Sequence, residues 1–155
     1  MAWTEISFGK HAGKSLPQIL FTDPDWFFWA VETGVFSKRP ALAIEAAQLD
    51  SRARHIKPPS KNLTNPIVEY LIHRPTMKFS HFNIVEREQE LHIGGSPAFR
   101  SNVIDMSVPR RIAQYDKTGC KSLISSLKLH IFGSKSARIT RERAEAFFSD
   151  VSNFL

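Results

Sequence analysis

Hydrophobic residues recur at helical spacing near both ends of the chain. Residues 23–33 predict a helix, because Asp23 is a typical N-cap and Gly34 suits the turn that ends a helix. Residues 40–54 and 140–155 predict two further helices, each with one apolar face. The apolar residues of these two faces are Leu42, Ala46, Leu49, Ala53, Phe147, Phe148, Val151, Phe154 and Leu155. We expect each helix to bury this face, so the amphipathic C-terminal helix should dock on the core.

The pattern in the middle of the chain is closer to the alternation that is typical of strands. Four segments predict strands: residues 3–8, 77–86, 90–93 and 103–108. Residues 65–72 and 121–132 fit a helix as well as a strand, so their assignment stays open. Together the segments predict an α+β fold with a small mixed sheet and three or more helices.

The clearest break in this pattern lies at residues 51–61. Pro58 and Pro59 stop a helix, and the basic residues around them have no acidic neighbour within the segment. We therefore expect a linker or exposed connector here. It would separate a module at residues 1–57 from a basic α+β domain at residues 62–155, unless both form one continuous domain.

Composition limits the class of protein. The chain has 155 residues, of which 42% are hydrophobic, and its twelve Phe and three Trp supply enough apolar surface for a core. Cys120 is the one cysteine, which excludes an internal disulfide and a zinc site built on paired cysteines. No apolar run approaches the length of a membrane span. We expect a cytoplasmic protein of bacterial, plasmid or phage type without a membrane partner.

Two glycines enclose a basic turn near the start of the chain, in the segment FGKHAGKSL at residues 8–16. The phosphate loop of nucleotide hydrolases needs four residues between its glycines, whereas Gly9 and Gly13 enclose three. The turn still suits an anion, because glycines let backbone amides approach a ligand while Lys10, His11 and Lys14 bring polar or positive groups. We expect phosphate to be the ligand of this turn.

Two tryptophans follow this turn on the predicted helix. Trp26 and Trp29 lie three residues apart and therefore on one side of that helix. An exposed indole there would stack on an unpaired base, whereas a buried one would belong to the core. Both interpretations stay open.

The turn and the helix DPDWFFWAVETGVF together resemble a small domain found at the carboxyl end of exodeoxyribonuclease X and in short proteins described as quorum-sensing-regulated virulence factors. The resemblance spans residues 3–36, and Ala12 departs from it where a basic residue is common. The matching positions are Phe8, Gly9, Lys10, His11, Gly13, Lys14, Leu16, Pro17, Phe28 and Trp29. It implies an accessory module that contacts nucleic acid and is not itself catalytic, since the exonuclease chemistry of that enzyme lies in a separate acidic domain.

Charge is concentrated toward the C-terminus. Residues 110–141 hold eight basic residues against the single acid Asp116, a surplus of seven that exceeds the net charge of +6 for the whole chain. The candidate phosphate contacts in this basic stretch are Arg110, Arg111, Lys117, Lys121, Lys135, Arg138 and Arg141. Alternatively, these basic side chains form a surface that faces solvent and binds no ligand.

Catalytic chemistry has no clear signature. The six histidines are scattered without metal-ligand spacing, and the acids form no ordered carboxylate set. We therefore expect no catalytic residue, metal or cofactor. The sequence favours a non-enzymatic accessory protein that binds the phosphate backbone of single- or double-stranded nucleic acid with low sequence specificity. The alternatives are a protein-interaction factor that modulates a machine of a mobile element or host through an acidic partner, and a small metal-dependent nuclease.

Overall fold

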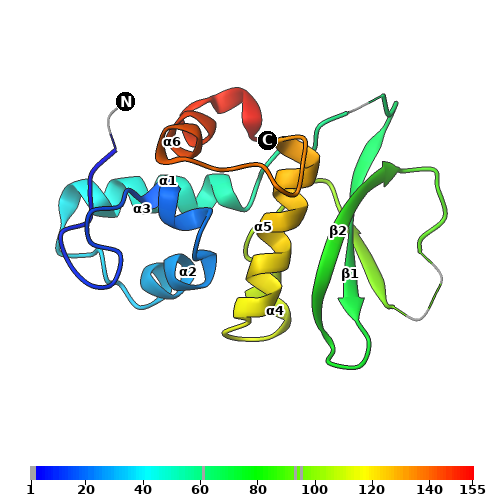
Figure 1. Ribbon diagram of the computed structural model, residues 1–155, viewed down its shortest axis with the longest axis horizontal. Coiled ribbons are helices and arrows are strands. Elements are labelled where there is room, and N and C mark those ends of the chain that lie inside the picture. The colour runs from blue at the N-terminus through cyan, green and yellow to red at the C-terminus, as the bar shows by residue number, and fades with distance from the viewer. Residues whose placement is uncertain (1–2, 61, 93, 95) are drawn as a thin grey trace.

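Helices gather at one end of the molecule and a sheet lies at the other, with one long helix between them (Figure 1). The computed structural model describes residues 3–60, 62–92, 94 and 96–155. Over these residues the α-helices are α1 Leu16–Leu20, α2 Pro24–Glu32, α3 Pro40–Ala53, α4 Val108–Ile112, α5 Lys117–Ile131 and α6 Arg141–Ser149, followed by the short 3-10 helix η1 Val151–Asn153. The strands are β1 Pro66–His73, β2 Lys78–Glu86 and β3 Ala98–Ser101. The predicted α+β class is confirmed.

The sheet has the order β2-β1-β3, and both strand pairs are antiparallel. Its central strand β1 carries Tyr70, which is fully buried and stacks on Phe99 of β3 with ring centroids 5.0 Å apart. The Tyr70 hydroxyl donates to the carbonyl of Val103 at 2.7 Å and accepts from the amide of Asp105 at 2.8 Å. These two bonds attach the chain that leaves β3 to the sheet and set where α4 begins.

The helices with clear caps lie where they are predicted. The side chain of Asp23 accepts from the amide of Trp26 at the start of α2, and that of Thr140 accepts from the amide of Arg143 at the start of α6. Helix α6 packs against α1 and buries Phe147 and Phe148, so the docked C-terminal helix is confirmed, but Val151 and Leu155 of its predicted apolar face are 69% and 66% exposed. The helix ends at Ser149, because Asp150 bonds the backbone and side chain of Ser152 and turns the chain into η1.

Two segments with an open assignment are now resolved. Residues 66–73 form the central strand, and residues 117–131 form α5, which packs against β2. Asp116 caps α5 through the amide of Gly119 at 2.8 Å. This segment is a helix and not a strand, because helical spacing lets Leu123, Ile124 and Leu127 all face the core.

Three predicted strands are wrong. Residues 3–8 make one isolated bridge, from Glu5 to Ser15, and residues 103–108 make one, from Ile104 to Ile56. Residues 90–92 form no strand, while the last residue of that predicted strand, Ile93, lies outside the described residues. The third strand is instead β3, whose four residues are too few to produce a readable period.

The expected exposed connector at residues 51–61 is also corrected. Helix α3 continues into it as far as Ala53, and Ile56 is fully buried. Ile56 forms isolated bridges to both Ile104 and Phe154, so this segment joins the chain leaving the sheet to the C-terminus. Burial of Ile56 anchors this basic segment, because fully burying an isoleucine side chain is worth about 1.5–3 kcal/mol.

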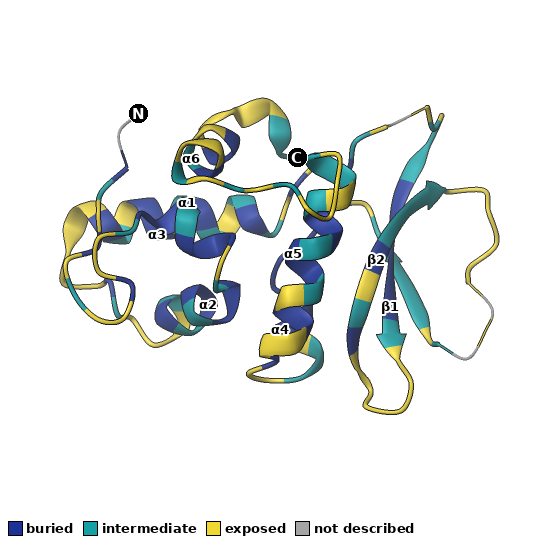
Figure 2. Ribbon diagram, in the orientation of Figure 1, coloured by how far each residue is buried: buried dark blue, intermediate teal, exposed yellow. Residues whose placement is uncertain are grey.

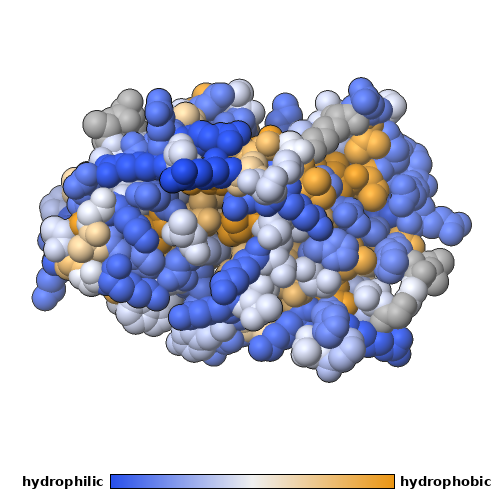
Figure 3. Space-filling model, viewed as in Figure 1, coloured by the Kyte–Doolittle hydropathy of each residue, from blue (hydrophilic) through white to orange (hydrophobic). Residues whose placement is uncertain are grey.

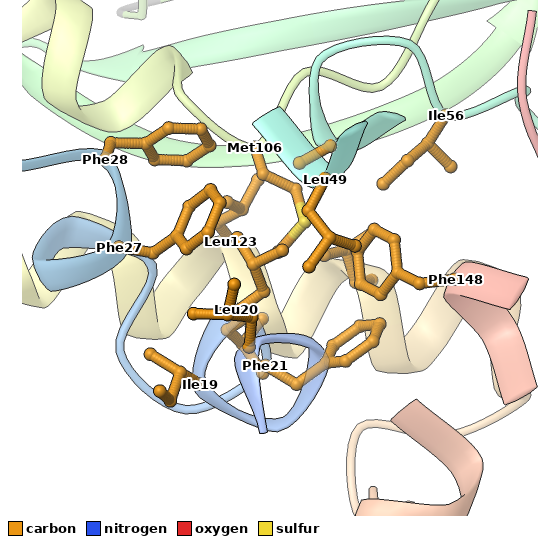
Figure 4. Close-up of a cluster of buried hydrophobic side chains, with 14 of the residues drawn as sticks. Ile19, Leu20, Phe21, Phe27, Phe28, Leu49, Ile56, Met106, Leu123 and Phe148 are labelled. Carbon is orange, nitrogen blue, oxygen red and sulfur yellow. The ribbon is translucent and has the colours of Figure 1, made fainter. Parts of the chain in front are cut away.

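A single hydrophobic cluster contains side chains from both sides of this connector (Figure 4). Phe27 and Leu49 from the first part of the chain lie beside Met106, Leu123 and Phe148 from the second. In Figure 2 the buried residues follow β1 and the inner sides of the helices, whereas exposed residues cover the turns. In Figure 3 hydrophilic residues cover most of the face shown, and hydrophobic atoms are visible between them near its centre and over the sheet. The two predicted modules therefore share one core.

Arg110 ties α4 to α2 inside the protein. Its side chain is 6% exposed, and one guanidinium nitrogen lies 3.0 Å from Asp25, which is 5% exposed. The same guanidinium bonds both carboxylate oxygens of Glu32, at 2.8 and 3.2 Å. These hydrogen bonds from Arg110 lower the pKa of Glu32. Arg110 thus neutralises a buried carboxylate and one at the surface.

Replacing Arg110 by Met should destabilise the protein by about 3–5 kcal/mol, because Asp25 then stays buried without a counter-charge. Urea denaturation followed by circular dichroism measures the loss. Arg74 is exposed and forms no ion pair within the described residues, so Arg74→Met is the matched control and should change stability by less than about 0.5 kcal/mol. Equal stability of the two variants would contradict the structural role of Arg110.

Candidate binding site

The basic turn between Gly9 and Gly13 is held by its own backbone. The amide of Gly13 donates to the carbonyl of Ile6 at 2.7 Å, that of Lys14 to His11 at 3.1 Å and that of Ala12 to Gly9 at 3.3 Å. Gly9 and Gly13 have φ values of +70° and +87°, which glycine adopts without strain. Three amides of the turn are thereby used, so the expected cradle of amides for an anion is wrong for these positions.

His11 joins the turn to the start of α2. Its ring is buried against Trp26, with centroids 4.9 Å apart, and Nε2 lies 3.0 Å from Oδ2 of Asp23. Burial lowers the pKa of His11 more than Asp23 raises it, so the neutral ring donates from Nε2. Burial acts to raise the pKa of Asp23, but hydrogen bonds from Lys10 and His11 hold it below its usual value. His11 therefore has a structural bond and is not a phosphate contact.

A hollow of about 250 Å³ opens beside this pair, between the turn, α2 and the start of α5. In Figure 1 these segments lie along the lower edge of the molecule. We call it the aromatic hollow, and its lining residues are Lys10, Asp23, Asp25, Trp26, Trp29, Tyr115 and Lys117. Residues from the turn and from the basic stretch, which are about a hundred positions apart, meet here.

Three aromatic rings form its wall. Trp26 and Trp29 are both half-buried, with ring centroids 6.4 Å apart, and Trp26 also packs on Phe36. Neither indole is therefore purely core nor fully exposed. Tyr115 is 56% exposed and has a φ of +58°, and the guanidinium of Arg110 lies 5.0 Å from its ring centroid. The left-handed backbone and this cation–π contact hold the ring at the rim.

Charges of both signs complete the hollow. Lys10 is 52% exposed and its Nζ lies 3.0 Å from Asp23, while Asp25 is already paired with Arg110. Lys117, the first residue of α5, is exposed and forms no ion pair within the described part of the chain. The acids are thus engaged by protein cations, and the lysines leave positive charge at the rim.

The other residues expected to contact phosphate lie elsewhere. Lys14 is half-buried, and Lys121, Lys135 and Arg138 are exposed away from the hollow. Arg111 is exposed and bonds Asp105 at 3.2 Å.

Two arginines of the basic stretch are tied into the protein. Arg110 is buried by its two acids, so its assignment to phosphate contact is corrected. Arg141 bonds Glu5 and Glu145, each at 2.7 Å, and its guanidinium lies 3.4 Å from the carbonyl of Gly13. It therefore anchors the basic turn to α6.

Tyr115 and Asp25 are the lining residues that the sequence does not single out, and Tyr115 is the one that offers a ring to a ligand. Its signal is weak: an aromatic residue next to the N-cap Asp116, inside a basic stretch. The left-handed backbone at Tyr115 and its place in the lining of the hollow are visible only in the structure.

Several chemical roles find no support in the geometry. Among residues 3–60, 62–92, 94 and 96–155, no group of three or more His, Cys, Asp or Glu side chains could hold a metal ion. Burial raises the pKa of the Cys120 thiol to about 12, so it stays protonated at neutral pH. No helix in the described part of the chain is long and apolar enough to span a bilayer.

Comparison of this chain with protein-family models, curated proteins and solved structures finds no match in any of the three.

The pH dependence of stability tests the state of His11. An unfolded chain protonates this histidine near pH 6.5, whereas burial keeps it neutral in the folded protein to a lower pH. Since the unfolded state then binds more protons, the free energy of unfolding should fall as the pH drops below 6.5. Urea titrations at about pH 7 and about pH 5 should show a larger loss for the wild type than for His11→Gln. Identical losses would mean that His11 has the same pKa in the folded and unfolded states, and a smaller loss for the wild type would mean that Asp23 keeps the ring charged in the folded protein.

Proposed function

We propose that this protein binds single-stranded nucleic acid without catalysing a reaction on it, and that an unpaired base enters the aromatic hollow. The observation that carries the proposal is the meeting of three aromatic rings with Lys10 and Lys117 in one hollow. Aromatic side chains for bases and cations for the backbone are the combination that single-strand binders use.

The aromatic wall favours a single strand over a duplex. The rings of Trp26, Trp29 and Tyr115 each offer a π face, and only an unpaired or terminal base has a free face to stack on them. A hollow of about 250 Å³ suits one planar ring system. Stacking accepts every base, which agrees with low sequence specificity.

The charge distribution supports a backbone contact nearby. Lys117 has no acidic partner in the described residues, and Lys10 shares Asp23 with a neutral histidine. The exposed Lys121, Lys135 and Arg138 add to the field around the strand without lining the hollow. Long-range attraction of this kind raises association rates and weakens with salt. The similarity of residues 3–36 to the exodeoxyribonuclease X domain favours the same accessory role.

Removing the ring of Tyr115 should weaken binding of a labelled single-stranded DNA by about 5- to 150-fold, the effect of losing one base-stacking contact. Tyr115 is exposed, so Tyr115→Ala should stay folded. Tyr115→Phe is the matched control and should bind as the wild type does, because stacking needs the ring and not the hydroxyl. Fluorescence anisotropy with the single strand and with a duplex measures both effects.

Two results would overturn this function. One is a wild-type protein that does not bind single strands even at about 50 mM salt, where phosphate contacts are strongest. The other is binding that Tyr115→Ala leaves unchanged. A partner protein captured after nuclease treatment, together with no direct binding of nucleic acid, would support the protein-interaction alternative.

A further inference from the structure

A second hollow of about 280 Å³ includes Arg110 in its lining. Its lining residues are Glu32, Arg54, Ser107, Arg110, Arg111 and Gln114, and we call it the arginine hollow. Three guanidinium groups face it with one carboxylate, that of Glu32, which Arg110 already binds through both oxygens. Each arginine is paired with an acid, namely Asp50 for Arg54, Asp25 and Glu32 for Arg110, and Asp105 for Arg111, so the hollow offers an anion N–H donors rather than a surplus of charge.

Contacts with its neighbours hold the Arg54 side chain in place and leave some N–H donors of its guanidinium group unused. Its Nε lies 3.1 Å from Asp50, one terminal nitrogen donates to Ser107 Oγ at 2.9 Å, and the guanidinium lies 5.0 Å from the ring centroid of Phe28. A guanidinium carries five N–H donors, so these two bonds leave further donors for an anion. Holding the side chain beforehand reduces the entropy lost on binding.

Arg111 and Gln114 form the open side of the same hollow. Arg111 is 59% exposed and uses one terminal nitrogen to bond Asp105, while Gln114 is exposed. The Ser107 hydroxyl donates to Asp105 at 2.6 Å and so is not available as a donor. The free donors of Arg54, Arg111 and Gln114 suit a tetrahedral oxyanion, and arginine forks match phosphate oxygens in particular.

Arg110 connects residues of the two hollows. It bonds Asp25, which lines the aromatic hollow, and Glu32, which lines the arginine hollow, and it supports the ring of Tyr115. Tyr115 and Gln114 are consecutive residues. Trp29 and Glu32 lie three residues apart on α2, a rise of about 4.5 Å along the helix. Neighbouring groups of one strand therefore reach both hollows.

We propose that the arginine hollow binds a backbone phosphate of the strand whose base stacks in the aromatic hollow. This inference rests on the proposed function and adds a second contact with its own chemistry. The aromatic contact contributes affinity that salt leaves unchanged, whereas the phosphate contact releases counterions and so contributes to the salt dependence.

A carboxylate placed in the hollow tests this contact. Gln114→Glu keeps the size of the side chain and adds a negative charge where the phosphate would lie. Binding of single-stranded DNA should weaken about tenfold, and the slope of log affinity against log salt should become shallower by about 0.7, the loss of one phosphate contact. Gln89→Glu is the matched control, since it makes the same change of charge at an exposed turn after β2, and it should keep the wild-type affinity and slope.

Arg111→Gln is a second variant that removes a donor without adding an acid, and it should also reduce the slope by about 0.7. Thermal unfolding checks that both variants remain folded. If Gln114→Glu and Gln89→Glu bind alike while Tyr115→Ala binds weakly, the phosphate site is overturned and the proposed function stands. If the wild type binds no single strand, both are overturned. A change of affinity without a change of slope would also overturn the phosphate site.

Discussion

The ion pair between Arg110 and Asp25 is the contact on which the candidate site depends. It lies inside the protein, where two charges have to compensate each other because water does not. Through it, α4 is held against α2 and the ring of Tyr115 is supported from beneath. The same side chain contacts residues that line both hollows. A residue that looks like a phosphate contact in the sequence therefore has an internal role: it fixes the positions of residues that can reach a ligand.

Hydrophobic packing brings the two ends of the chain to this site. Ile56 is buried between the segment that leaves the sheet and the C-terminus, and one cluster of side chains spans both sides of the basic connector. Arg141 binds the turn at Gly13 from α6. The basic turn thus has neighbours from the start, middle and end of the sequence, and this explains how Lys10 comes to lie near Lys117.

The sequence predicts the parts of the fold that local interactions determine. Helices α2 and α6 begin at side-chain caps and α3 follows from its apolar face, and all three begin where they are expected, although α6 ends at Ser149. The strands are less well predicted, because β3 is short and because Ile104 makes a single bridge where a strand is expected. Of the candidate site, Lys10, Trp26, Trp29 and Lys117 are predicted and do line one hollow. The partners of Arg110 are 78 and 85 residues away, a separation that no local pattern encodes.

At Tyr115 the residue that would make the fold most stable differs from the residue that would contact a ligand best. A non-glycine residue in this conformation costs about 1–2 kcal/mol, and glycine would avoid that cost. Glycine would also leave the aromatic hollow without its exposed ring. Mutations selected only for a more stable fold should therefore accumulate at Tyr115, whereas selection for an intact hollow should keep an aromatic residue there despite the strain.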